Sequence, residues 1–172
     1  HATLMDEDAA SLMRTQGVYM VPTLSALATT AACPMGCGIP HSALSKAKTM
    51  RARHERSFKQ ALHGEIPIAL GTDAGTPFNF HGENAQELER MVALGMSPMQ
   101  AIQSATSAAA ALLGIDDMVG TIRTGQVADL LFVNGNPLTR IGMLRDPTRI
   151  MGVMQAGEFV TGPLTHEPTR ER

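Results

Sequence analysis

The most informative segment of the chain is Ile68-Ala69-Leu70-Gly71-Thr72-Asp73-Ala74-Gly75, in which an apolar run leads directly into a carboxylate among small residues. The run begins at Ile66, and a continuous apolar segment of this kind is typical of a strand that is buried on both faces. In parallel α/β folds, ligands bind at the carboxyl ends of the strands. Asp73 occupies that position, where it could ligate a metal ion or could simply cap the next turn; the residues alone leave both open.

Helices and strands alternate ahead of this segment. Asp6 is placed to cap a first helix, and Val18-Tyr19-Met20-Val21 follows as a short apolar strand. Residues 25–40, which are rich in small residues, Gly and Pro, are predicted to form a loop. A long helix is predicted over residues 42–63, with His54 on its apolar stripe as a packing residue rather than a ligand.

The chain after Asp73 continues with helices and then changes character. A helix is predicted over residues 85–95, and Ser97-Pro98-Met99-Gln100 is typical of a capping box that starts another, ending at Gly114. This alternation predicts parallel strands joined by helical crossovers. Beyond it, short β segments broken by Gly and Pro indicate a small β subdomain; they lie at 120–122, 127–133, 152–154 and 158–160.

Several further motifs accompany the Asp73 segment: His81-Gly82-x-Asn84-x-x-Glu87-Leu88, Met91-Val92-x-x-Gly95-Met96-Ser97-Pro98, Ala101-Ile102-x-x-Ala105-Thr106, Ala110-Ala111-Leu112-Leu113-Gly114 and Gly120-Thr121-Ile122-x-x-Gly125-x-x-Ala128-Asp129-Leu130. Together they resemble the amidohydrolase superfamily, in its imidazolonepropionase-like and prolidase-like branch, over about residues 1–160. The resemblance implies an α/β fold. Residues 1–116 would be the C-terminal portion of a (β/α)8 TIM-like barrel, from the end of strand six to strand eight and the following helices. Residues 117–163 would be part of a small β subdomain, and residues 164–172 a polar tail.

The resemblance also implies a metal centre at the carboxyl ends of the barrel strands, with one or two divalent ions, zinc being favoured. The aspartate after the last strand binds metal and shuttles a proton in that family, a role that maps onto Asp73. His1 lies where the family has a metal-binding His after strand six, although Ala2 departs from the usual Gly. A histidine with no role at the start of the chain is the alternative for His1.

Three more residues are candidates for substrate binding. His81 follows the Asp73 segment and could hydrogen-bond an oxyanion or a substrate carboxylate, or could be a solvated loop residue. Thr23 and Ser25 follow the Val18–Val21 strand and could line the same pocket, although both are ordinary turn residues. Asp129 is interpreted as a structural residue of the β subdomain.

The family's other metal ligands, a His-x-His pair, a carboxylated Lys and a further His on earlier strands, have no counterpart here, since the chain contains no His-x-His. Asp73 and His1 make two protein ligands, whereas catalytic zinc sites usually have at least three. We therefore expect a C-terminal fragment that is inactive alone and that either needs the missing N-terminal half or oligomerises.

The composition narrows the possible partners. A net charge of −2 and an aromatic content of 3% argue against nucleic acid as a partner. No apolar run approaches the roughly 20 residues that span a membrane. Cys33 and Cys37, spaced C-x3-C, do not make a disulfide framework and lack the partners of a structural zinc site. The compartment is undetermined, with a slight preference for the cytoplasm, because the chain begins at His1 and an N-terminal signal would not be observed.

These expectations combine into one favoured function. The chain would belong to a metal-dependent amidohydrolase that cleaves C–N amide bonds of dipeptides or N-acyl amino acids through a metal-activated water, with Asp73 as the proton shuttle. The alternatives are a hydrolase of imidazolones or other cyclic amides, of esters or of organophosphates. A non-catalytic half-barrel that only binds or assembles is the alternative from another class.

Overall fold

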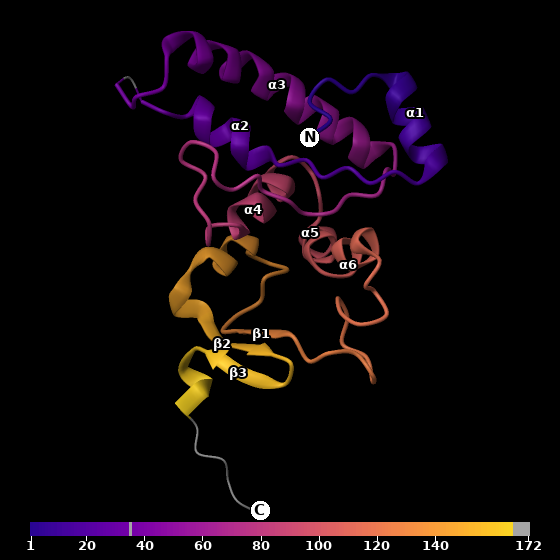
Figure 1. The fold of residues 1–172 in the computed structure, drawn as a ribbon, viewed down its shortest axis with the longest axis vertical. Coiled ribbons are helices and arrows are strands. Elements are labelled where there is room, and N and C mark those ends of the chain that lie inside the picture. The colour runs from indigo at the N-terminus through magenta and orange to yellow at the C-terminus, as the bar shows by residue number, and fades with distance from the viewer. Residues whose placement is uncertain (35, 167–172) are drawn as a thin grey trace, which may run out of the picture.

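A computed structural model of the chain describes residues 1–34 and 36–166, and its elements follow one another along an elongated molecule (Figure 1). The helices α1 (Glu7–Gln16), α2 (Leu24–Ala31) and α3 (His41–His63) form one end. The middle consists of α4 (Ala85–Ala93), α5 (Pro98–Ala105) and α6 (Ser107–Leu113). The other end holds three strands, β1 (Leu130–Val133), β2 (Ile150–Gln155) and β3 (Glu158–Thr161), with the short 3-10 helices η1 (Ile141–Arg145), η2 (Pro147–Arg149) and η3 (Pro163–His166).

The predicted helix starts are confirmed at both ends of the helical region. The Asp6 side chain caps α1 by accepting a hydrogen bond from the Ala9 backbone nitrogen at 2.8 Å. The capping box at Ser97 opens α5, with Gln100 as its reciprocal partner. The single helix expected from there to Gly114 is instead divided into α5 and α6, because the backbone at Thr106 leaves the helical region (φ −126°, ψ −95°).

The loop predicted over residues 25–40 is wrong for its first part, which forms the helix α2. The sequence shows no local cap there: Thr23 makes no side-chain capping bond, and its hydroxyl donates instead to the Pro22 carbonyl at 2.7 Å. The carboxylate of Glu87, which is distant in sequence, accepts hydrogen bonds from the first backbone N–H groups of α2. A long-range contact therefore allows a helix where the local sequence favours a loop. Cys33 and Cys37, in the loop after α2, are joined by a disulfide.

The two apolar segments predicted as parallel strands do lie side by side. They meet in a single parallel bridge between Met20 and Ile68, with Met20 N donating to Pro67 O at 2.8 Å and Ala69 N donating to Met20 O at 3.0 Å. Neither segment extends into a longer strand among the described residues. The parallel pairing brings the residues that follow each segment to the same end of the pair.

The core lies between these two segments and the helices α3, α4 and α5. Phe58, Ala61, Met91 and Ala101 are almost completely buried in it. Burial of a large apolar side chain, such as that of Phe58 or Met91, stabilises a fold by about 1.5–3 kcal/mol. The full cluster consists of Met20, Leu24, Phe58, Ala61, Ile66, Ile68, Leu88, Met91, Met96, Ala101 and Ile141.

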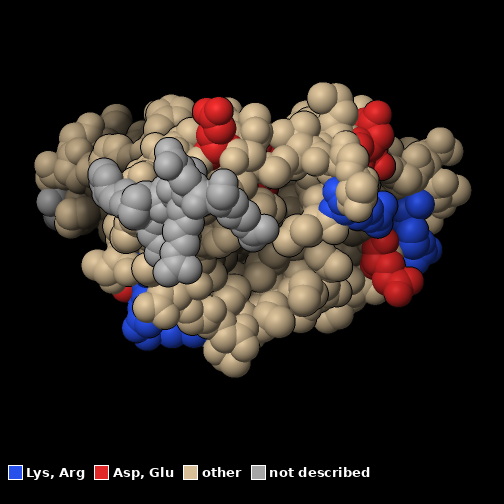
Figure 2. All heavy atoms as spheres, turned by 90° about the horizontal axis from the view of Figure 1, so that it is seen from below, with Lys and Arg blue, Asp and Glu red and all other residues tan. Residues whose placement is uncertain are grey.

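The β end is a three-stranded antiparallel sheet in the order β1-β2-β3. The strand expected at residues 120–122 does not form. Asp129 is structural, as predicted, because its carboxylate accepts a hydrogen bond from Ala156 N at 2.8 Å in the β2–β3 turn. Seen from this end, most of the side chains in view carry no charge, and the acidic and basic side chains lie in a few separate groups (Figure 2). Among the described residues, no helix combines the length and apolar character needed to cross a membrane.

Candidate functional site

Three of the five predicted site residues come together at the ends of their segments. His1 Nε2 lies 3.9 Å from Asp73 Oδ2, and His1 Nδ1 is hydrogen-bonded to the Thr23 hydroxyl. These residues border a cavity of about 380 Å³. Its remaining lining residues are Thr3, Leu4, Ala26, Leu27, Thr30, Met50, His54 and Thr76.

The backbone at this site adopts an unusual conformation at three positions. Ala2, Thr23 and Asp73 have φ values of 48°, 52° and 54°, in the left-handed region that residues other than glycine rarely adopt. Each such residue costs on the order of 1–3 kcal/mol and persists only where its surroundings hold it in place. Because all three lie within one small region, the fold accepts this cost where the candidate site residues converge.

Asp73 is held through its backbone, while its carboxylate stays accessible. The Asp73 carbonyl accepts hydrogen bonds from the Thr76 hydroxyl and from the Asn79 side-chain amide, each at 3.0 Å. The Asn79 amide also donates to the Thr72 carbonyl at 2.6 Å. The carboxylate, 45% exposed, makes no cap to the following turn and faces His1 instead. The turn after Asp73 is therefore stabilised without its carboxylate.

His1 is positioned by the helix α3. The buried His54 ring donates through Nε2 to the His1 carbonyl at 3.1 Å. Burial lowers the pKa of His54, which favours the neutral imidazole. Ser57, one turn further along α3, donates to the Thr3 carbonyl at 3.1 Å. The packing role predicted for His54 is thus confirmed, and the residue also fixes the backbone that carries the candidate ligand.

The hydrogen bond between His1 Nδ1 and the Thr23 hydroxyl, whose own proton is donated to the Pro22 carbonyl, orients the His1 ring. With Nδ1 on the Thr23 hydroxyl, Nε2 is the nitrogen that faces Asp73. An imidazole nitrogen and a carboxylate oxygen are common ligands of zinc and similar divalent ions, and a hydrogen bond to the second ring nitrogen is usual for a metal-binding His. The pair thus fits as two ligands of a metal ion. Among residues 1–34 and 36–166, no group of three His, Cys, Asp or Glu side chains forms a more complete set.

The other two predicted site residues lie elsewhere. Ser25 is fully buried, and its hydroxyl donates to Glu87 at 2.6 Å, so it does not line the cavity. The reason is that Ser25 faces α4 from the first turn of α2. His81 is exposed in the loop after Asp73 and lies beside Gly75, where an added Cβ would be 3.6 Å from its Nε2. It does not border the His1–Asp73 cavity.

Glu87 is not among the predicted site residues, although it lies within one of the motifs that accompany Asp73. Its carboxylate is fully buried and accepts from Leu24 N at 2.6 Å, Ser25 N at 2.8 Å and the Ser25 hydroxyl. Burial raises its pKa, while the three donors act in the opposite direction. Its position next to Leu88, on the apolar side of a predicted helix, could have indicated this role, because a buried carboxylate needs hydrogen-bond donors.

Comparison with known proteins places these features in a family. Residues 1–160 match the family model described as the amidohydrolase family. The chain is 30% identical over 165 residues to the ochratoxinase of Aspergillus niger, covering 95% of this chain and 33% of that protein. A solved Xaa-Pro dipeptidase with methionine bound in its active site superposes with a TM-score of 0.84 at 38% identity, covering 94% of this chain and 39% of that one. A prolidase in complex with N-methylphosphonate-L-proline also has a TM-score of 0.84, at 28% identity, with 94% and 39% covered. The chain thus spans about a third of the length of the ochratoxinase it matches.

Proposed function

Because this chain belongs to the amidohydrolase family, we propose that it contributes the ends of barrel strands six, seven and eight to the active site of a metal-dependent amide hydrolase. The observation that carries the proposal is the convergence of His1 Nε2 and Asp73 Oδ2, 3.9 Å apart, at the mouth of one cavity. The parallel bridge between Met20 and Ile68 supports it, since it aligns the two segments whose ends carry Thr23 and Asp73.

In this proposal His1 and Asp73 hold a divalent metal together with ligands from parts of the enzyme outside these 172 residues. An imidazole and a carboxylate suit zinc. A metal ion bound there would supply the acidity that lowers the pKa of water toward about 7. Thr23 would keep Nε2 of His1 available as a ligand by hydrogen-bonding Nδ1.

Asp73 would move the proton in the reaction. Its carboxylate accepts a proton from the attacking water as the new carbon–oxygen bond forms at the amide carbonyl, and then donates that proton to the nitrogen as the C–N bond breaks. This role needs an accessible carboxylate on a fixed backbone. Asp73 meets both conditions, because the Thr76 and Asn79 side chains hold its carbonyl.

The proposed substrates are dipeptides or N-acyl amino acids. Ala26 and Leu27 from α2 and Met50 from α3 form an apolar side of the cavity, which suits an apolar substrate side chain. A prolidase and a Xaa-Pro dipeptidase among the structural relatives favour this class over cyclic amides and organophosphates.

The test uses the full-length enzyme that contains this chain, assayed on dipeptides and N-acyl amino acids. Asp73→Asn should lose nearly all turnover while its far-UV circular dichroism stays unchanged. Asp117→Asn, which removes the same charge at an exposed position, is the matched control. Near-normal kcat for Asp73→Asn would contradict the assignment.

A second measurement separates catalysis from a purely binding or assembling half-barrel. The full-length enzyme should hold divalent metal near stoichiometry, and the 172-residue chain alone should hold much less, because it supplies two ligands where catalytic sites usually have three or more. A full-length protein that takes up no metal and turns over no amide would favour the non-catalytic alternative.

A further inference from the structure

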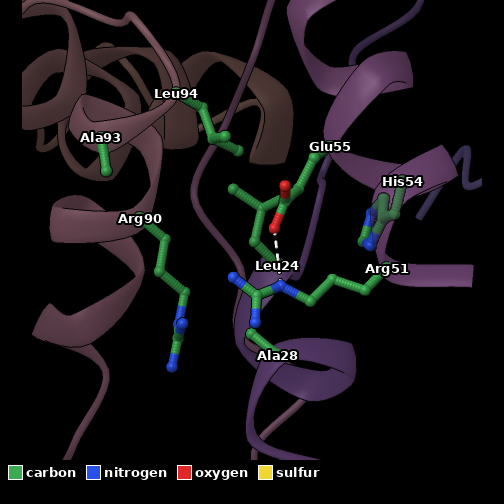
Figure 3. A pocket seen from close by; sticks show the side chains of 8 residues that line it. All are labelled: Leu24, Ala28, Arg51, His54, Glu55, Arg90, Ala93 and Leu94. Carbon is green, nitrogen blue, oxygen red and sulfur yellow. Dashed lines mark hydrogen bonds and ion pairs between the residues drawn. The ribbon is translucent and has the colours of Figure 1, made fainter. Parts of the chain in front are cut away.

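A second, smaller cavity lies where α2, α3 and α4 meet. It has a volume of about 100 Å³, and Figure 3 shows the side chains around it. Ala28 comes from α2, Arg51 and Glu55 come from α3, and Arg90 comes from α4. In Figure 3 the Arg51 side chain extends from α3 toward α4, and the Arg90 side chain projects from α4 and turns downward. Two cations thus line one small cavity.

Arg90 lacks the partners that a half-buried arginine ordinarily has. Its Nε atom is buried without a hydrogen-bond acceptor among the described residues. Among the described residues, its Nη2 donates to Gln86 Oε1 at 3.5 Å, the outer limit of a hydrogen bond. The neighbouring Glu87 carboxylate accepts its hydrogen bonds from the backbone nitrogens of Leu24 and Ser25 instead. A buried donor without an acceptor is uncommon, and a bound water or ion is one way in which such a donor is satisfied.

Arg51 adds a second, partly available guanidinium. Its Nε donates to Glu55 at 2.6 Å, which leaves the terminal nitrogens without a hydrogen bond among the described residues. Burial lowers the pKa of Arg90, and the nearby positive charge of Arg51 lowers this pKa further. The negative charge of Glu87 acts in the opposite direction. Glu55 offsets the charge of Arg51 through their ion pair, and Glu87 and Glu89 partly offset the charge of Arg90. A water molecule would satisfy only the free donors, whereas an anion would also neutralise the remaining charge of Arg90.

We propose that this cavity binds a small oxyanion, a phosphate or a carboxylate, between the guanidinium groups of Arg51 and Arg90. The planar guanidinium matches the spacing of two oxygens on either group, and such charge-assisted hydrogen bonds are the stronger ones in proteins. The size of the cavity restricts the ligand to an ion or to the end group of a larger molecule. The site is separate from the His1–Asp73 cavity, although the His54 ring borders both.

Methyl NMR of the full-length enzyme that contains this chain tests the proposal through the methyl groups of Leu24 and Leu94, which line the cavity. Inorganic phosphate and, separately, acetate are added at constant ionic strength maintained with sodium chloride. Saturable shifts of these methyl signals are expected with at least one of the two anions, and the tighter one identifies the oxyanion class. Shifts that stay linear and small with both anions would overturn the proposal.

Variants distinguish a specific anion-binding site from nonspecific electrostatic attraction of anions to the protein. Arg90→Gln should weaken binding about tenfold or more, since hydrogen bonds to charged groups are lost. Arg53→Gln removes the same charge from an exposed position of α3 outside the cavity and should leave the affinity unchanged. Ala28→Leu keeps both cations but fills the cavity, so it should abolish binding even if Arg90→Gln proves poorly folded. Equal weakening by Arg90→Gln and Arg53→Gln, or unchanged binding in Ala28→Leu, would refute a specific site.

Discussion

Glu87 and Ser25 are joined by two hydrogen bonds at the buried start of α2: Glu87 Oε2 accepts from the Ser25 backbone nitrogen at 2.8 Å and from its hydroxyl at 2.6 Å. The second carboxylate oxygen accepts from Leu24 N. A carboxylate at a helix N-terminus satisfies free N–H groups and is favoured by the helix dipole. Since α2 begins directly after Thr23, this contact between α4 and α2 also fixes the segment that holds Thr23 against His1.

Replacing Glu87 by Gln should destabilise the chain by roughly 1–3 kcal/mol, because the amide NH2 would face buried donors of α2 that then lack an acceptor. Urea unfolding followed by circular dichroism measures the change. Glu83→Gln makes the same substitution at an exposed position and should have little effect. Equal stability of the two variants would show that the buried carboxylate is dispensable.

The raised pKa of Glu87 should make the stability of the fold depend on pH. Burial raises the folded-state pKa of Glu87 above its ordinary value of 4.5, so over the interval above 4.5 the folded chain retains a proton that the unfolded chain has released. The contribution of Glu87 to the free energy of unfolding therefore falls as pH rises through that interval. His54, whose pKa is lowered, contributes the opposite slope below 6.5 in any variant that keeps it.

Comparing variants isolates the Glu87 contribution. Urea unfolding of the wild-type chain and of Glu87→Gln at a series of pH values should show a stability difference that shrinks as pH rises above 4.5. Because His54 is present in both chains, its effect cancels in this difference. A difference that is constant across the series would mean that the pKa of Glu87 is not raised.

Thr23→Val tests the orientation of His1. Valine keeps the branched shape but removes the hydroxyl that hydrogen-bonds Nδ1. Loss of such a partner typically lowers metal affinity or activity about 10–100-fold, and we expect a change of that size in the full-length enzyme. Metal affinity is measured by competition with a chelator. Thr30→Val alters the same cavity without touching His1, and a comparable loss there would rule out a specific role for Thr23.

Gly71→Ala tests the close approach of the two apolar segments. A Cβ at Gly71 would clash with Cγ1 of Val21, too close for either side chain to stay in place. We expect a destabilisation of about 1–3 kcal/mol in urea unfolding, as for other overpacked sites. Adding Val21→Ala should recover part of the loss, since it removes the atom in conflict. A double variant no more stable than Gly71→Ala would point to another cause.

The local sequence predicts much of the fold, and it also predicts Asp73, the central residue of the candidate site. Asp6 and the Ser97-Pro98-Met99-Gln100 motif set helix starts through contacts within three residues, so the chain alone reveals them. The apolar run before Asp73 likewise indicates a buried segment and a carboxylate at its end. The α2 helix and the role of Glu87 could not be read in this way, because the donors and the acceptor lie more than sixty residues apart.

The order of apolar runs and helices along the sequence predicted the parallel pairing of the two apolar segments, and the positions of Asp73 and Thr23 after those runs made them candidates. His1 became a candidate through the resemblance to the amidohydrolase superfamily. Only the tertiary structure decided which candidates meet. It turned Ser25 toward Glu87, placed His81 outside the cavity, and set His1 Nε2 toward Asp73 through Thr23 and His54. The physical reason is that side-chain direction depends on packing between distant elements, and hydrogen bonds across those elements select one orientation from several that the local sequence permits.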